Sequence, residues 1–212
     1  MKEIIIASCI VVIIVLCALL YYFNIIPNGY DKNYDYLNTY KSTVDKDLDG
    51  VDDQTDILNS AKEYLDTRPI YESMYSVSGY PTNGYGVCTD VVAFALKGAG
   101  YDLMNLVNED ILANRELYDI KDVDKRIDFR RVKNLLVYFK RHSESLTLDT
   151  DLIEQWQPGD IVVFSGHIGI ISDKRNGKGV PFVLHHYSKL QVSYEEDILN
   201  RFGKIVGHFR VS

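Results

Sequence analysis

A cysteine and two histidines have the types and spacing that nucleophilic catalysis requires. Cys88 follows a loop rich in Gly and Tyr at residues 78–86 and precedes the apolar run 91–96, so we expect its sulfur at the N-terminus of a buried helix. Unpaired N–H groups at such a terminus favour a thiolate, which is the nucleophilic form. His167 and His185 lie on two successive predicted strands, and an antiparallel pair can bring such positions face to face. One imidazole could then accept the thiol proton while the other orients it.

Each of these residues also has a structural interpretation. Most free cysteines are small buried hydrophobes, and a histidine among β-branched neighbours is usually a satisfied structural side chain. The residue pattern alone leaves both interpretations open. Cys9 and Cys17 lie inside an apolar N-terminal run, so Cys88 is the only cysteine of the folded part and no disulfide can form there.

Residues 45–56 have the spacing of a calcium-binding loop. In such a loop positions 1, 3, 5, 9 and 12 supply carboxylates, position 6 is glycine and position 7 offers a backbone carbonyl. Position 12 is aspartate here, where glutamate is usual, which weakens bidentate closure. The alternative is an acidic, solvated linker. A bound Ca²⁺ would have a structural role, and the expected ligands are Asp45, Asp47, Asp49, the carbonyl of Val51, Asp53 and Asp56.

Composition excludes several classes of protein. Of the 212 residues 46% are hydrophobic, 25% charged and 12% aromatic, which rules out a disordered, collagen-like or coiled-coil chain. The net charge of −7 argues against a nucleic-acid partner held by bulk electrostatics. Between residues 24 and 66 ten acids stand against four lysines, a net −6, so most of the negative charge belongs to one local segment.

The chain begins with an apolar segment long enough to cross a bilayer. Residues 4–23 contain no charge, and about 20 apolar residues in a helix span the hydrocarbon core. We predict an uncleaved single-pass anchor at 1–23 and a tether at 24–44. A cleaved signal peptide is the alternative, but it has a shorter apolar region followed by small residues, and aromatic residues stand at 21–23. Lys2 before the span favours a cytoplasmic N-terminus, which would place the folded domain outside the cell membrane.

The remaining pattern predicts helices followed by strands. Apolar residues at helical spacing predict helices over 57–65 and 91–96, and a later helix with Asp128 as its N-cap. Short apolar segments separated by turn residues predict strands at 161–164, 168–171, 182–184 and 205–209. This order indicates an α+β domain in which N-terminal helices pack on a small antiparallel sheet.

The combined order of these motifs resembles a known superfamily. The segments are GVCTDVV at 86–92, PGDIV at 158–162, HIGI at 167–170 and LH at 184–185. Together they are similar to the NlpC-type, papain-like cysteine peptidases of bacterial cell walls. The stretch from residue 45 onward resembles more closely the bacterial family called domain of unknown function 1287. The resemblance implies an NlpC-type papain-like fold for a catalytic domain at 45–212.

The resemblance also implies roles for the site residues. Cys88 would be the nucleophile, His167 the general base and His185 the orienting third residue. Residues 89–90 are Thr-Asp where many of these enzymes have Ser-Gly. His186 adjoins His185, and because strand alternation puts the two on opposite faces, only one of them can join the pair.

Two tyrosines of the loop before the thiol are candidates for the substrate cleft. Tyr80 and Tyr85 would wall the cleft, and core or surface placement is the alternative. The implied reaction is hydrolysis of an amide of the peptidoglycan stem peptide through an acyl-enzyme, with no cofactor for catalysis. Two other functions remain open: a non-catalytic, calcium-braced module that binds cell wall, and an acyltransferase that uses the same thiol.

Overall fold

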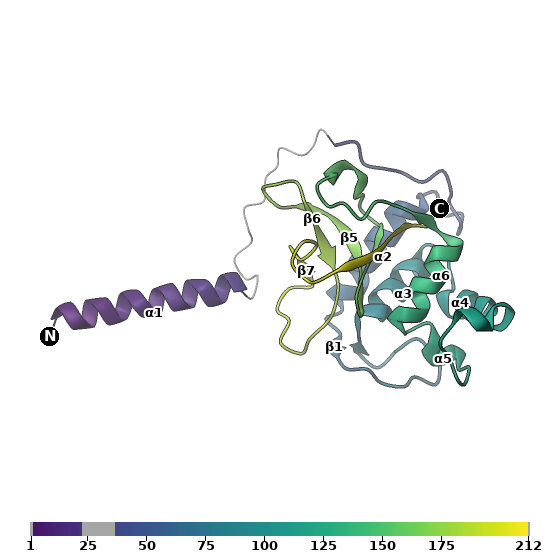
Figure 1. Ribbon diagram of the computed structural model, residues 1–212, viewed down its shortest axis with the longest axis horizontal. Helices are drawn as coiled ribbons and strands as arrows, with labels where there is room; N and C mark the ends of the chain where they lie inside the picture. The colour runs from purple at the N-terminus through teal and green to yellow at the C-terminus, as the bar shows by residue number, and fades with distance from the viewer. Residues whose placement is uncertain (1, 23–36, 212) are drawn as a thin grey trace.

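The computed structural model describes residues 2–22 and 37–211 (Figure 1). The N-terminal segment is a helix, α1 (Lys2–Tyr22), along which side chains such as Ile10 and Leu16 are exposed. Within the described part of the chain, no helix combines the length and apolar character needed for a membrane crossing. The anchor predicted at 1–23 is therefore not confirmed. The predicted tether lies outside the described residues as far as residue 36.

The described part of the predicted tether, residues 37–44, packs on the domain. The N–H of Tyr40 donates to the Gln157 side chain at 2.8 Å, and the Arg210 guanidinium lies 4.1 Å from the Tyr40 ring centre. The N–H of Ser42, a buried residue, donates to Asp52 at 3.0 Å. Tyr40 and Ser42 therefore contact the folded domain directly, and the boundary at residue 45 stays a prediction.

Helices dominate the first half of the domain. The helix predicted over 57–65 is α2 (Asp53–Asp66), which begins where the Asp52 side chain accepts the N–H of Thr55. The buried helix predicted over 91–96 is α3 (Cys88–Gly98). The other helical elements are α4 (Leu103–Ala113), α5 (Lys125–Asp128), α6 (Val132–His142) and the short 3₁₀ turns η2 (Arg115–Leu117) and η3 (Ile153–Gln155).

One predicted helix start is wrong. The helix α6 begins after Arg131, whereas Asp128 ends the preceding short helix α5. The Asp128 carboxylate turns back to accept the N–H of Asp124 at 2.8 Å, so it stabilises the entry to α5 instead of capping α6.

The second half of the chain forms a six-stranded antiparallel sheet. Its strands are β3 (Glu144–Ser145), β8 (Ile205–Arg210), β4 (Ile161–Phe164), β5 (His167–Arg175), β6 (Pro181–Leu184) and β7 (Glu195–Glu196), in this spatial order. All four predicted strands are present, which confirms the α+β class. A separate parallel pair joins β1 (Ile70–Tyr71) to β2 (Tyr85–Gly86).

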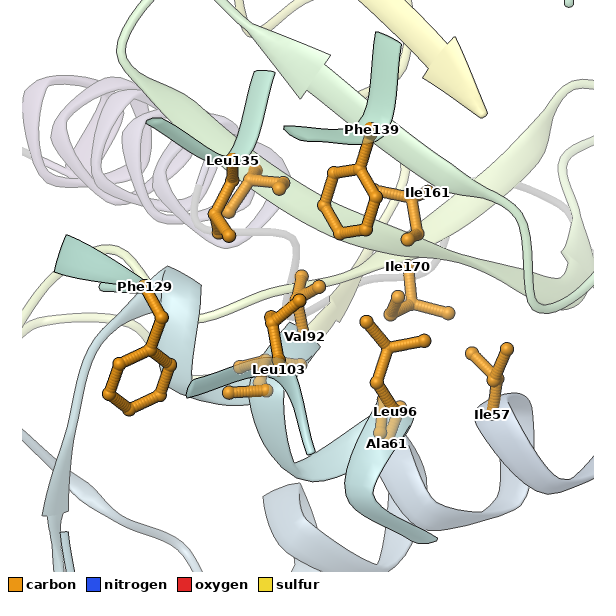
Figure 2. Packing of buried hydrophobic residues seen from close by; sticks show 14 of the residues in the cluster. Ile57, Ala61, Val92, Leu96, Leu103, Phe129, Leu135, Phe139, Ile161 and Ile170 are labelled. Atoms are coloured by element: carbon orange, nitrogen blue, oxygen red, sulfur yellow. The ribbon is translucent and has the colours of Figure 1, made fainter. Parts of the chain in front are cut away.

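The main core lies between the helices and one face of this sheet. Figure 2 shows Leu96 of α3 and Ile57 of α2 directed toward Ile161 and Ile170 of the sheet. All four side chains are fully buried, and burying a side chain of this size contributes about 1.5–3 kcal/mol. Alternate residues of the strands face a second cluster, which includes Trp156, Val162, Phe164 and Ile171. Both faces of the central strands are therefore covered, and α3 is held against the start of β5.

A buried ion pair fixes the first turn of α3. The Asp90 carboxylate accepts the N–H of Val87, the N-cap residue, at 2.8 Å. It also receives Nε and Nη2 of Arg130 at 2.6 and 2.8 Å, and the two side chains are 0% and 6% exposed. Arg130 reaches further, to the carbonyl of Met74 at 2.6 Å. The position of Cys88 therefore depends on contacts from two distant segments.

We expect Arg130→Met to lower the free energy of unfolding by about 3–5 kcal/mol, because it leaves the Asp90 charge buried without a partner. Arg126→Met is the matched control: the Arg126 side chain is 43% exposed and its partner Asp124 is 39% exposed, so its loss should cost less than about 1 kcal/mol. Urea unfolding followed by circular dichroism measures both. Equal, small losses for the two variants would contradict the role given to the pair.

Candidate active site

The thiol lies where a helix N-terminus meets the start of a strand. Cys88 is the first residue of α3, and the backbone N–H groups of Ile168 and Thr89 lie close enough to its sulfur to lower its pKa. Ile168 is the second residue of β5 and follows His167 directly. The sulfur therefore lies beside the peptide that joins His167 to Ile168. The side chain of Cys88 is 9% exposed.

Burial keeps the thiol protonated in this structure. Removal of Cys88 from water raises its pKa to about 11, and the nearby Asp90 charge also raises it. The N–H groups of Ile168 and Thr89 lower the pKa, but by less than burial raises it. The expectation of a thiolate favoured by the helix terminus is therefore wrong for the structure without ligand, because desolvation is the larger effect.

The two histidines predicted to pair are in direct contact. Nε2 of His167 lies 3.0 Å from Nδ1 of His185, and the rings stand nearly perpendicular at 85°. His167 begins β5 and His185 follows β6, two strands that pair antiparallel. Among the described residues the His167 ring bonds to His185 and not to the sulfur of Cys88. Its Nδ1 has no hydrogen-bond partner within that part of the chain.

The structure also separates His185 from His186. His186 is 1% exposed, and its ring meets Tyr71 and Tyr194 edge-on at 5.2 and 4.9 Å between centroids. Its Nδ1 is buried and finds no hydrogen-bond partner among residues 2–22 and 37–211. Among the described residues His185 and not His186 hydrogen-bonds to the His167 ring, which favours His185 for the predicted third role.

Burial lowers the basicity of two of these rings. Removal from water, with His185 close by, lowers the pKa of His167 to about 3 and that of His186 to about 4. Both rings are therefore neutral near pH 7. A neutral imidazole can accept a proton, which the base in the predicted reaction must do.

Two residues beside the site were not found from the sequence. Glu196 of β7 places Oε2 3.0 Å from Nε2 of His185, with both side chains at least nine-tenths buried. Tyr71 of β1 lies near enough to the thiol that the charge of an ionised Cys88 raises the pKa of the Tyr71 hydroxyl. Glu196 stands in a run of three acids, residues 195–197, and β7 is only two residues long, so no periodic pattern marked it.

The tyrosines predicted to wall a cleft lie elsewhere or are less defined. Tyr80 is 7% exposed and packs against Phe94 and Phe129, with its hydroxyl 3.2 Å from Asp102. It belongs to the core, because its ring fills the space between these two aromatic residues. Tyr85 is half-buried on β2, where it pairs with Ile70.

The acidic loop gathers part of the predicted ligand set. One carboxylate oxygen from each of Asp45, Asp47 and Asp49 lies within 4.8 Å of the others. The N–H of Val51 donates to Asp49 at 2.8 Å, which closes the loop. Asp53 is not part of the group: it is 1% exposed and accepts hydrogen bonds from the Tyr101 hydroxyl and the N–H of Lys46. The sequence did not indicate that the Asp53 carboxylate is hydrogen-bonded to Tyr101, a residue from another part of the chain.

Asp56 joins this group by its electrostatics. Burial and the charges of Asp49, Asp47 and Asp45 raise the pKa of Asp56 to about 6. Its Oδ2 is buried, and no described residue forms a hydrogen bond with it. The four carboxylates repel one another, and either a proton or a cation would offset this repulsion.

The fold and the site define an α+β domain with a buried thiol beside a pair of histidines. Residues 58–211 match the family described as "Domain of unknown function (DUF1287)". The "Uncharacterized protein YijF" of Escherichia coli (strain K12) is 34% identical over 167 residues, which cover 73% of this chain and 80% of that protein. The chain therefore belongs to this family. No solved structure matches the chain.

We expect alkylation of Cys88 by iodoacetamide to be slow at pH 7 and to rise about tenfold per pH unit up to pH 10, because only the thiolate reacts and burial raises the pKa to about 11. Cys9→Ser and Cys17→Ser provide the background, since both cysteines are exposed. Mass spectrometry measures the rate at each pH. A rate that is already constant between pH 6 and pH 8 would contradict a protonated thiol.

Proposed function

We propose that this protein is a cysteine hydrolase that cleaves an amide bond through an acyl-enzyme. The observation that carries the proposal is the placement of Cys88 at a helix N-terminus next to the peptide that follows His167, with the neutral His167 ring held through Nε2 by His185. A nucleophile, a base and a group that orients the base are the three parts that such a reaction requires. They come from three separate elements of the fold.

The neutral state of both partners fits a concerted start to the reaction. As the sulfur of Cys88 attacks the amide carbonyl, its proton passes to His167. Burial disfavours either charge alone, but the thiolate and the imidazolium attract each other strongly when they form together in a site of low polarity. The imidazolium then gives its proton to the leaving amine, and the acyl group stays on sulfur as a thioester.

Water completes the cycle. His167, neutral again, takes a proton from a water molecule that attacks the thioester, and it returns this proton to the sulfur as the C–S bond breaks, so the thiol leaves and the carboxylic acid forms. The N–H groups of Cys88 and Thr89 at the start of α3 lie near the sulfur and would stabilise the negative oxygen of each tetrahedral intermediate. Ca²⁺ has no part in these steps.

The proposed substrate is an amide of a peptidoglycan stem peptide. This rests on the resemblance of the motifs around Cys88, His167 and His185 to NlpC-type peptidases, and with it comes the proposed papain-like fold. An anchor at residues 1–23 would hold the domain against the cell wall from outside the membrane. We propose no nucleic-acid partner, because a net charge of −7 repels a polyanion.

A second candidate function is a cell-wall-binding module without catalysis. The specific observation in its favour is the thiol itself: Cys88 is 9% exposed and its pKa is raised. A structural cysteine has these properties. The buried hydrogen bond between His167 and His185 favours the hydrolase instead, because a binding module has no need of a neutral base held in a fixed orientation.

We expect the protein to release products from purified muropeptides, and Cys88→Ala and His167→Gln to abolish the release, because they remove the nucleophile and the base. The matched control is His142→Gln, since His142 is 42% exposed on α6 and takes no part in the site. Mass spectrometry of the digest measures the products. Digests identical for wild type and Cys88→Ala would overturn the hydrolase, and acyl transfer to an added amine in place of water would identify a transferase.

Calcium binding by the acidic loop is also a proposal. It is supported by the convergence of Asp45, Asp47 and Asp49 and by the orphaned oxygen of Asp56. The cation would brace the start of α2, where Asp53 and Asp56 form part of the first turn.

We expect isothermal titration at pH 7.5 to detect Ca²⁺ binding that weakens as the pH falls through 6, because the proton on Asp56 competes with the cation. Asp47→Ala should remove the heat. Asp122→Ala, an exposed acid outside the loop, is the control and should leave it unchanged. The absence of binding heat in the wild type would discard the site.

A further inference from the structure

We propose that Glu196 is a positioning residue that sets the proton positions on both active-site imidazoles, so that Nδ1 of His167 is left bare and able to accept the proton of Cys88. The catalytic consequence rests on the proposed function. The proton positions themselves do not: they follow from hydrogen-bond chemistry with His185 in its neutral form, and a doubly protonated His185 in the wild type at pH 7 would overturn them.

The first step is the contact between Glu196 and His185. A carboxylate can only accept hydrogen bonds, so at 3.0 Å from Oε2 of Glu196 the ring nitrogen Nε2 of His185 must carry a proton. Gln191 places its Nε2 3.2 Å from the same nitrogen, but that amide can donate to the carbonyl of His185, also at 3.2 Å. Its orientation is set because its Oε1 accepts the N–H of Tyr187 at 2.8 Å. The charged acceptor is the nearer and the stronger of the two.

The second step passes this choice to the other ring. A neutral imidazole has a single N–H, so a proton on Nε2 of His185 leaves its Nδ1 as an acceptor. That Nδ1 is 3.0 Å from Nε2 of His167, which must therefore be the donor. His167 is neutral near pH 7, so its own Nδ1 carries no proton. One carboxylate thereby determines the tautomer of a ring that it does not touch.

The third step concerns charge in the reaction. When His167 accepts the thiol proton it becomes an imidazolium, and its Nε2–H remains directed at His185. The Glu196 anion, 7% exposed, then stands at the other end of the two hydrogen bonds and stabilises the positive charge. Without Glu196, His185 could take the opposite tautomer and donate from its Nδ1 to Nε2 of His167. Nε2 of His167 would then be the acceptor, and the single proton of that ring would lie on Nδ1.

The neighbouring glutamate provides a matched control. Glu195 differs from Glu196 by one position on β7, and strand alternation points it to the opposite side. Its carboxylate hydrogen-bonds to Ser172 and Lys174, and among the described residues it has no hydrogen bond to either histidine of the pair. Glu195→Gln therefore makes the same chemical change one residue away without touching the relay of hydrogen bonds.

The direct test is ¹⁵N NMR of protein labelled at histidine, in which the shifts of the two ring nitrogens report the tautomer. In the wild type at pH 7 we expect both His167 and His185 in the Nε2–H form. In Glu196→Gln we expect the Nδ1–H form of both rings to become populated, and in Glu195→Gln we expect no change. A wild-type His185 in the Nδ1–H form would overturn the proposal, as would a Glu196→Gln spectrum identical to that of the wild type.

Turnover supplies the second readout. We expect Glu196→Gln to lower kcat for muropeptide hydrolysis by about 10²-fold with KM unchanged, since proton transfer by a positioned base contributes about 10²–10⁴-fold, and Glu195→Gln to keep wild-type turnover. An equal kcat for Glu196→Gln and wild type would overturn the positioning role. If the tautomers are as expected and no muropeptide is cleaved by the wild type, the relay stands and the proposed hydrolase falls.

Discussion

The hydrogen bond between Nε2 of His167 and Nδ1 of His185 is the interaction on which the proposed chemistry depends. It exists because β5 and β6 pair antiparallel in a register that places Ile170 opposite Leu184, which brings the start of one strand to the end of the other. Gly169 makes this approach possible: a Cβ there would lie 2.8 Å from the carbonyl oxygen of Leu184 and 3.3 Å from Cβ of His185. The sheet thus holds the His167 ring in one orientation, and Cys88 at the start of α3 lies beside the peptide that follows this ring.

Burial gives the same site its second property, which is the absence of charge in the structure without ligand. Desolvation raises the pKa of Cys88 and lowers that of His167, so proton transfer between them must create both charges at once. In the proposed reaction the thiol therefore stays protonated, and weakly nucleophilic, until a substrate binds. The buried Asp90–Arg130 pair adds to this by fixing the helix start without placing a free cation beside the sulfur.

Sequence reasoning located the elements better than it described their environment. Periodicity placed α2, α3 and the strands β4, β5, β6 and β8, and the separation of His167 from His185 was enough to predict their contact across an antiparallel pair. The predicted thiolate at Cys88 was wrong because local sequence indicates a helix terminus but not the extent of burial, which depends on how distant elements pack. Glu196 was not predicted for a related reason. Its contact with His185 depends on the pairing of β7 with β6, and β7 has only two residues, too few for a periodic hydrophobic pattern. Asp53 and Tyr80 lie outside the sites predicted for them. Asp53 is buried and hydrogen-bonded to Tyr101, and Tyr80 packs on Phe129.

The most direct test of the central claim is to look for the covalent intermediate on sulfur. Intact-protein mass spectrometry after rapid acid quench of a reaction with muropeptides should show the wild type carrying one acyl group, and peptide mapping should place that group on Cys88. The same experiment on His167→Gln should show little or no adduct, because the thiol keeps its proton. Product formation without any adduct, or an adduct on another residue, would contradict nucleophilic catalysis by Cys88.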